Sequence, residues 1–189
     1  MTAMAATCAE ENYCSLECEK YILKGLGVEF DEQQMLADAI GQGWLKEKGT
    51  ALYNVGRHLE AKGLLVKRRY KCTVKDIESA LKEDESVIAV VDGGELLGNR
   101  SEEIMEDILI GQIPDHTVVV LSYNPTARTI TVYDPNSSNV EDTYPIEQFK
   151  DAWEDSRNYL VTITSNNLKT YIPTPIDLSD VELSEDLNE

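Results

Sequence analysis

The sequence is poor in positive charge, in long apolar stretches and in histidine, of which it has two. Its 17 Lys and Arg residues stand against 35 Asp and Glu residues, which gives a formal net charge of -18. Such an anionic surface repels phosphate backbones and anionic lipids, so we expect neither nucleic-acid nor membrane partners. The longest apolar stretches, 87–91 and 117–121, are far too short to span a bilayer. Residues 1–6 show no signal peptide, which favours a cytoplasmic protein or one secreted without a visible signal.

Cysteine is also scarce, with four residues at positions 8, 14, 18 and 72. A chain of 189 residues with 42% hydrophobic residues can build one domain with its own core, and it does not need disulfide staples. Among the first three cysteines, Cys14 and Cys18 are the one pair with the short spacing of a zinc knuckle, and no second such pair of cysteines or histidines completes a zinc site. We therefore expect no metal and no cofactor, and consider instead that one cysteine is a nucleophile.

Helical patterns dominate the first half of the chain and strand patterns the second. Helices are predicted from Cys14 to about Lys24, after the N-cap Asp31, from the cap Thr50 to Lys62, and after the cap Thr73. Strands are predicted over 64–70, 86–91, 117–123, 129–134 and 159–164, with a further helix over 145–154. Helices followed by antiparallel strands indicate an α+β domain, which we place at residues 1–167.

Two segments have no clear helix or strand pattern. Residues 94–114 carry several carboxylates and are expected to form a short helix or a flap. Residues 168–189 carry one Lys and six acidic residues, with prolines at 173 and 175, and are expected to form a flexible acidic tail.

Cys14 and His116 stand out because of their places in these elements. Cys14 begins the first helix, where the positive end of the helix dipole favours a thiolate. His116 begins one strand of a predicted hairpin whose other strand ends at Asp134 and Asn136, so a carboxylate or amide from either residue could reach the imidazole. A cysteine, a histidine that deprotonates it and a group that orients the histidine are the minimum for nucleophilic acyl transfer.

The segment Asn12-Tyr13-Cys14-Ser15-Leu16-Glu17-Cys18 resembles the nucleophile segment of the papain-like, bacteriocin-processing (double-glycine leader) peptidases. The similarity continues through Asp115-His116-Thr117-Val118-Val119-Val120 and Val132-Tyr133-Asp134-Pro135 to Phe149 and Trp153, and covers roughly residues 8 to 163. This resemblance implies a papain-like fold, with N-terminal helices packed against a C-terminal antiparallel sheet, and a peptide or protein substrate. It further implies Cys14 as nucleophile, His116 as base and acid, Asp134 as the orienting carboxylate, and Cys18 as a packing residue. No transporter segment follows, so we expect a free-standing relative.

The sequence departs from the family pattern at the oxyanion hole. The family places a glutamine six residues before the nucleophile, where this chain has Cys8. The backbone N–H of Cys14 and the side chain of Asn12 are the candidate replacements. Loss of one oxyanion donor typically costs ~10²–10³ in turnover. Two alternatives to a peptidase therefore stay open: a non-catalytic papain-like module that binds a basic partner, and a deamidase or transferase with the same triad.

Other conspicuous residues are assigned to structure. His58 is expected at the solvent boundary of the third helix, and Cys72 is expected to be structural. The basic residues 57, 67, 68, 69 and 71 are expected to meet the protein's own carboxylates. The sequence does not indicate an oligomeric state.

Overall fold

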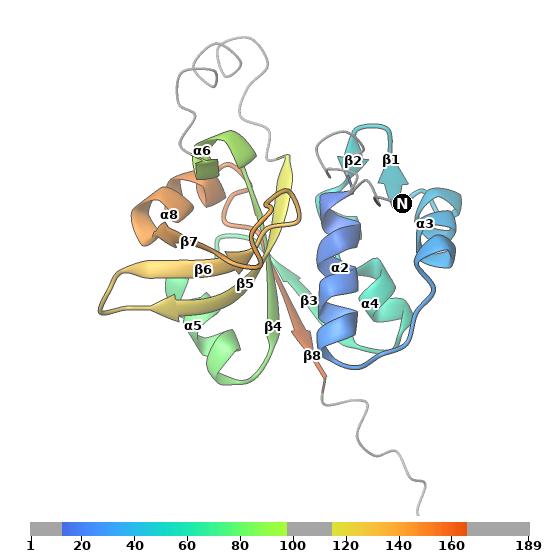
Figure 1. Cartoon of the computed structure of the whole chain (residues 1–189), viewed down its shortest axis with the longest axis horizontal. Coiled ribbons are helices and arrows are strands. Elements are labelled where there is room, and N and C mark those ends of the chain that lie inside the picture. The colour runs from blue at the N-terminus through green and yellow to red at the C-terminus, as the bar shows by residue number, and fades with distance from the viewer. Residues whose placement is uncertain (1–12, 98–114, 166–189) are drawn as a thin grey trace, which may run out of the picture.

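The computed structural model describes residues 13–97 and 115–165 (Figure 1). Helices and strands follow the order α2 (Cys14–Gly25), α3 (Glu32–Gly41), β1 (Leu45–Lys46), β2 (Gly49–Thr50), the 3-10 turn η1 (Leu52–Asn54), α4 (Arg57–Ala61), β3 (Leu65–Arg69), α5 (Val74–Lys82), β4 (Ser86–Val91), α6 (Gly93–Leu97), β5 (His116–Asn124), β6 (Thr129–Tyr133), β7 (Asp142–Pro145), α8 (Ile146–Glu154) and β8 (Leu160–Thr164). The predicted α+β class is confirmed.

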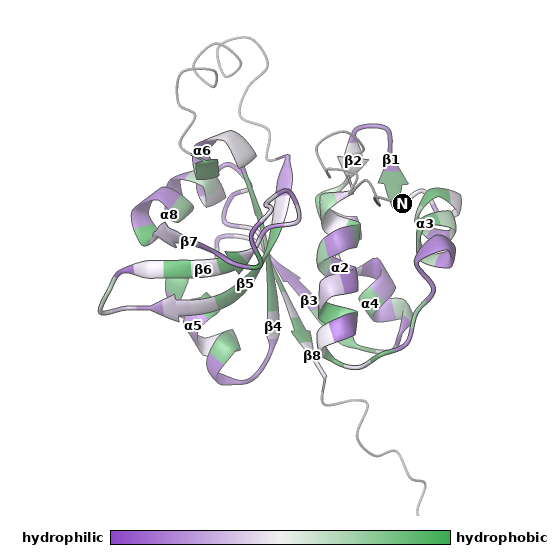
Figure 2. Ribbon diagram, viewed as in Figure 1, coloured by the Kyte–Doolittle hydropathy of each residue, from purple (hydrophilic) through white to green (hydrophobic). Residues whose placement is uncertain are grey.

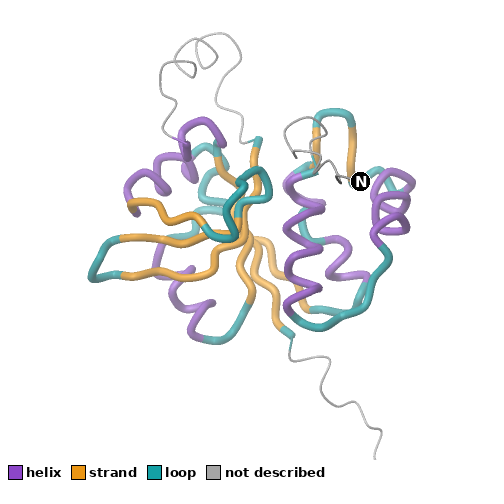
Figure 3. The backbone as a smooth tube through the Cα atoms, in the orientation of Figure 1, coloured by secondary structure: helices purple, strands orange, loops and turns teal. Residues whose placement is uncertain are grey.

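One antiparallel sheet of six strands, in the order β3-β8-β4-β5-β6-β7, forms the centre of the molecule. Figure 3 shows these strands between two groups of helices. Side chains alternate along β4: Val87 and Ala89 join a core cluster with α5 and α8, whereas Ile88 and Val90 join a second cluster with α2 and α4. The sheet is thus covered on both faces, which explains why its central strands read as continuous apolar runs.

Hydropathy distinguishes the central strands from the edge. In Figure 2, β4 is mostly hydrophobic, whereas β3 at one edge of the sheet is mostly hydrophilic. The basic residues of β3 pair with carboxylates, as expected: Arg68 Nη1 lies 2.6 Å from Glu60 Oε1, and Arg69 Nη1 lies 3.1 Å from Asp76 Oδ1. Charged side chains on an edge strand discourage pairing with another chain.

Two predicted helix starts are confirmed in atomic detail. The Asp31 side chain accepts a hydrogen bond of 2.7 Å from the backbone N–H of Gln34. Asp76 Oδ2 accepts hydrogen bonds from both the backbone N–H and the hydroxyl of Thr73, at 2.8 and 2.7 Å. Both contacts satisfy polar groups at a helix start, which is why these residue types mark such positions in a sequence.

The predicted single helix from Thr50 to Lys62 is wrong. The chain forms β2, η1 and the short α4 instead, and it breaks at Gly56, which has a φ of 86°. The Gly56 N–H donates to Glu19 Oε1 at 3.0 Å, and a Cβ at Gly56 would lie 3.0 Å from Val66 Cγ1. A close approach to β3 and a buried carboxylate therefore override the helical spacing of the apolar residues. The short strands β1, β2 and β7 were not predicted, and the tail 168–189 and most of 94–114 lie outside the described residues.

Candidate active site

A pocket of about 220 Å³ opens where α2, β5 and the end of β6 meet. Its lining includes all three residues of the predicted triad: Cys14 at the first position of α2, His116 at the first position of β5, and Asp134 directly after β6. The remaining lining residues are Gly93, Gly94, Leu97, Asp115 and Asn136. Segments far apart in the sequence thus bring a cysteine sulfur, an imidazole and a carboxylate to one pocket.

His116 and Asp134 form a buried pair within this pocket. His116 Nε2 lies 2.7 Å from Asp134 Oδ1, and the same oxygen accepts a hydrogen bond of 2.8 Å from the backbone N–H of Asn136. Burial raises the pKa of Asp134, but the hydrogen bond and charge of His116 and the backbone donors outweigh it, so that its pKa is lowered. The carboxylate is therefore ionised at neutral pH and orients the ring, with Nε2 turned toward it.

The sheet register fixes the position of His116. Val91, the last residue of β4, pairs with His116, and the turn into α6 then passes beside the ring. The Gly93 N–H donates to Asp115 Oδ1 at 3.1 Å. A Cβ at Gly93 would lie 3.2 Å from His116 Cβ, closer than ordinary van der Waals contact, so the bare glycine lets the turn approach the histidine.

Cys14 is buried at the start of α2, with 7% of its surface exposed. It is disulfide-bonded in this structure, whereas Cys18 and Cys72 are free. Our expectation that the chain lacks disulfides is therefore wrong for Cys14. A disulfide sulfur cannot attack a carbonyl, so any nucleophilic role of Cys14 belongs to the reduced protein.

Cys18 lies one helical turn after Cys14 and is fully buried. Its Sγ–H donates to the backbone carbonyl of Thr117 at 3.2 Å, on the strand that carries His116. Burial first, and the charge of Asp134 second, raise the pKa of Cys18 well above its usual range. This cysteine is therefore a protonated thiol in the interface between α2 and the sheet.

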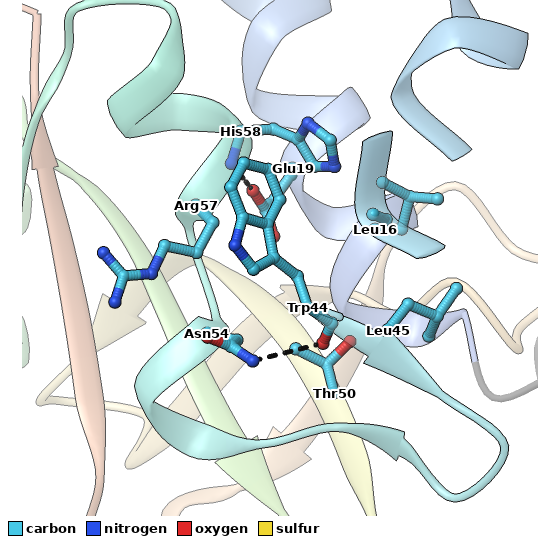
Figure 4. Close-up of a pocket in the computed structure, with 9 residues that line it drawn as sticks. Leu16, Glu19, Trp44, Leu45, Thr50, Asn54, Arg57 and His58 are labelled. Carbon is cyan, nitrogen blue, oxygen red and sulfur yellow. Dashed lines mark hydrogen bonds between the residues drawn. The ribbon is translucent and has the colours of Figure 1, made fainter. Parts of the chain in front are cut away.

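A second, much smaller pocket of about 10 Å³ lies between α2, the β1–β2 hairpin and α4 (Figure 4). Its central groups are Glu19, Trp44 and His58. Glu19 Oε2 accepts a hydrogen bond of 2.8 Å from the backbone N–H of His58, and the His58 ring packs edge-on against Trp44 at 5.0 Å between centroids.

His58 is buried, so its expected place at the solvent boundary is wrong. Its Nε2 has no hydrogen-bond partner among the described residues. Burial lowers the pKa of His58, which keeps the ring neutral. Nothing in this pocket brings a cysteine to the histidine, so we assign it a structural role.

A family model described as the Peptidase_C39 like family matches residues 3–161. The chain belongs to this family. A search of curated proteins finds no match.

Solved structures of C39-type proteins share the fold. A double glycine motif protease from an AMS/PCAT transporter, in complex with the leader peptide, is 15% identical with a TM-score of 0.52, over 79% of this chain and 82% of that one. A protein described as a C39-like peptidase from Bacillus anthracis is 12% identical with a TM-score of 0.56, over 82% and 89%. The N-terminal C39-like domain of a toxin secretion ATP-binding protein from Vibrio parahaemolyticus is 17% identical with a TM-score of 0.54, over 80% and 95%. These similarities confirm the papain-like architecture implied by the resemblance.

Cys8, at the position of the family's oxyanion glutamine, and the candidate donor Asn12 lie outside the described residues of this C39-like chain. In contrast, Gly93, Gly94 and Leu97 line the pocket without having been predicted as site residues. The sequence signal for the two glycines was a Gly-Gly pair one residue after the apolar strand 86–91. Their place beside His116 depends on the register of β4 with β5, which the sequence pattern alone does not define.

Over residues 13–97 and 115–165, no three His, Cys, Asp or Glu side chains are arranged to hold a metal ion. Within the same ranges, no helix combines the length and the apolar character needed to span a bilayer.

Proposed function

We propose that this C39-like protein is a papain-like cysteine peptidase whose nucleophile is Cys14. The observation that supports this most directly is the shared pocket of Cys14, His116 and Asp134, with His116 Nε2 held at 2.7 Å from the Asp134 carboxylate. Because Nε2 faces the carboxylate, Nδ1 is the ring nitrogen that remains to exchange a proton with the thiol and the substrate.

The proposed reaction has two halves. The Cys14 thiolate attacks the carbonyl carbon of the scissile amide and forms a C–S bond, and the resulting oxyanion collapses as the C–N bond breaks. His116 gives its proton to the leaving amine. His116 then removes a proton from water, which attacks the thioester, and the C–S bond breaks to release the acid and restore the thiolate. Asp134 keeps its negative charge throughout and stabilises the imidazolium.

We propose a peptide as substrate, because the double glycine motif protease with the same fold was solved in complex with its leader peptide. The pocket, of about 220 Å³, offers space beside Cys14 and His116 for the groups next to the scissile bond. The exposed apolar side chain of Leu97 and the carboxylate of Asp115 at the pocket provide one apolar and one acidic contact for substrate side chains.

Selective alkylation tests the nucleophile. In the reduced protein we expect an alkylating reagent to label Cys14, which shares a pocket with His116, faster than Cys18 and Cys72, and His116→Ala to abolish this preference. Peptide mapping by mass spectrometry gives the rate at each cysteine. Equal labelling of all cysteines would contradict the proposal.

Peptide cleavage tests the reaction. Cys14→Ser should lose activity by at least ~10³-fold, whereas the matched control Cys72→Ser, on the opposite face of the sheet, should retain it. Mass spectrometry of the products separates the candidates, because a peptidase cuts the chain and a deamidase leaves it intact. Products of unchanged length in the presence of wild-type protein would favour the deamidase alternative.

Activity should also depend on reduction, because Cys14 is disulfide-bonded in this structure. We expect wild-type protein to be active only after treatment with a dithiol reductant. Full activity of unreduced wild-type protein would show that the disulfide does not control the nucleophile.

A further inference from the structure

One face of α2 carries the candidate nucleophile and two contacts to the sheet. Cys14, Cys18 and Tyr21 are four and three residues apart, so that they lie on one side of the helix. Cys18 contacts β5, and Tyr21 contacts the last residue of β6. The helix that carries Cys14 is therefore attached, along a single stripe, to β5, which carries His116, and to the end of β6, which Asp134 directly follows.

The first contact adjoins His116. Cys18 Sγ donates to the backbone carbonyl of Thr117 at 3.2 Å, and Thr117 directly follows His116 in β5. The thiol is completely buried and keeps its proton because its pKa is raised by burial and by the charge of Asp134. It can therefore donate this hydrogen bond throughout the neutral pH range.

The second contact adjoins Asp134. The rings of Tyr21 and Tyr133 are stacked, with their centroids 4.0 Å apart and their planes 16° from parallel. Tyr133 is the last residue of β6 and directly precedes Asp134. A flat stack of two rings resists rotation of α2 about its axis and resists displacement of the helix from the sheet.

We propose that Cys18 and Tyr21 are positioning residues, which hold α2 at two points so that Cys14 meets His116 and Asp134 in reactive geometry. This inference rests on the proposed function. Its physical basis is that each contact joins α2 to a residue adjacent in the chain to one triad member. A slide or roll of α2 of about 1 Å would move Cys14 relative to the imidazole, and errors of that size can lower turnover ~10²-fold.

The test is the rate of Cys14 alkylation in the reduced full-length protein, measured as a function of pH and together with kcat and KM for peptide cleavage. Cys18→Ala removes the donor and Tyr21→Ala removes the stack, whereas Cys18→Ser and Tyr21→Phe retain them. The matched controls are Cys72→Ala, a buried thiol in the cluster on the other face of the sheet, and Tyr70→Ala, an exposed tyrosine that contacts Tyr159.

We expect Cys18→Ala and Tyr21→Ala to lower kcat and the neutral-pH alkylation rate by ~10–100-fold and to move the midpoint of the alkylation profile to higher pH, with KM little changed. The conservative variants should stay within about threefold of wild type. The thermal midpoint of each variant separates misplacement from unfolding. If Cys18→Ala does not fold, Cys18→Val takes its place, because it lacks the donor but fills the volume.

The outcomes distinguish the two proposals. The positioning role alone would be overturned if Cys14 showed His116-dependent reactivity in wild type and the folded variants Cys18→Ala (or Cys18→Val) and Tyr21→Ala kept wild-type rates and pH profiles. Equal losses in the controls Cys72→Ala and Tyr70→Ala would also overturn it, because the effect would then be general destabilisation. Absence of His116-dependent reactivity in wild-type protein would overturn the proposed function and this inference with it.

Discussion

The pKa of a buried carboxylate in this protein depends on the groups that contact it. Asp134 and Glu19 are both buried carboxylates, with 3% of each surface exposed, yet their environments differ. A histidine and backbone donors lower the pKa of Asp134, whereas burial raises the pKa of Glu19 to about 7 despite its own backbone donors. The first residue is therefore suited to stabilise a positive charge in a reaction, and the second is a source of pH-dependent stability.

Asp134→Asn tests the orienting carboxylate. An asparagine retains the size of the side chain but loses the charge, so that it can neither stabilise the His116 imidazolium nor hold the ring as strongly. We expect kcat for peptide cleavage to fall by ~10²-fold, with KM changed much less. Asp84→Asn, an exposed aspartate with a φ of 56° that asparagine also tolerates, is the matched control. Equal kcat values in wild type and Asp134→Asn would argue against a catalytic dyad.

Glu19→Gln tests the buried carboxylate. The pKa of Glu19 is raised from its ordinary value of 4.5 to about 7, first by burial. A raised folded-state pKa contributes stability that is complete below the unfolded-state value and is lost as the pH rises to about 7. From these two values, wild type should lose up to roughly 3 kcal/mol of unfolding free energy over this range that Glu19→Gln does not lose.

Urea denaturation at about pH 5 and about pH 8 measures this difference for both proteins. Wild type and Glu19→Gln are compared at each pH. The carboxylates whose pKa values are lowered are common to both proteins, so their contributions to the pH dependence of the unfolding free energy cancel. The exposed Glu83→Gln is the control for a simple change of charge. An identical pH dependence in wild type and Glu19→Gln would show that Glu19 does not titrate in this range.

At the scale of elements, the turn between β4 and α6 determines how closely the chain approaches His116. In Gly93→Ala the new Cβ would lie 3.2 Å from His116 Cβ and 3.3 Å from Asp115 Oδ1, so the histidine must shift by a few tenths of an ångström. We expect kcat to fall by ~10-fold while the thermal midpoint changes by only a few degrees. The control is Gly41→Ala, whose Cβ would have no neighbour within 4 Å. Unchanged kcat in Gly93→Ala would mean that the ring tolerates the displacement.

The elements that were predicted correctly are those whose signals are local. The strand over 86–91 is apolar on both faces, and the helix starts at Asp31 and Thr73 carry their own capping groups. The break at Gly56 was missed because its cause is distant in the sequence: a buried carboxylate on α2 that accepts the Gly56 N–H, and the proximity of Val66. The burial of His58 follows from the same contact and was missed for the same reason.

In the candidate site, too, the features that could be predicted are those with local signals in the sequence. His116 and Asp134 could be proposed together because they lie at adjacent ends of one predicted hairpin, whereas Cys14 was proposed from its place at a helix start and from the family resemblance of its segment. The contacts of Cys18 and Tyr21 could not be predicted from the sequence, since both depend on how α2 packs across the sheet. The disulfide of Cys14 could not be predicted either, because a chain with an adequate core gives no reason to expect a disulfide.

At the scale of the whole molecule, the formal net charge of -18 sets a long-range electric field around the pocket. Asp115 adds an exposed carboxylate at the pocket itself. A field of this sign attracts cationic peptides and repels anionic ones, and it acts mainly on the rate of encounter. The charge should therefore influence which peptides reach Cys14 without changing the chemistry that follows.

Paired peptides test this directly: two substrates that differ only in Lys or Gln at positions away from the scissile bond. At about 20 mM ionic strength we expect kcat/KM to be ~10-fold higher for the lysine peptide, and at about 0.5 M the two values should converge because salt screens the field. Values of kcat should stay equal at both ionic strengths. Asp115→Asn separates a local contact from the field of the whole protein, since it should remove only part of the preference at low salt. A preference that persists undiminished at high salt would show that a specific contact, rather than the net charge, selects the lysine peptide.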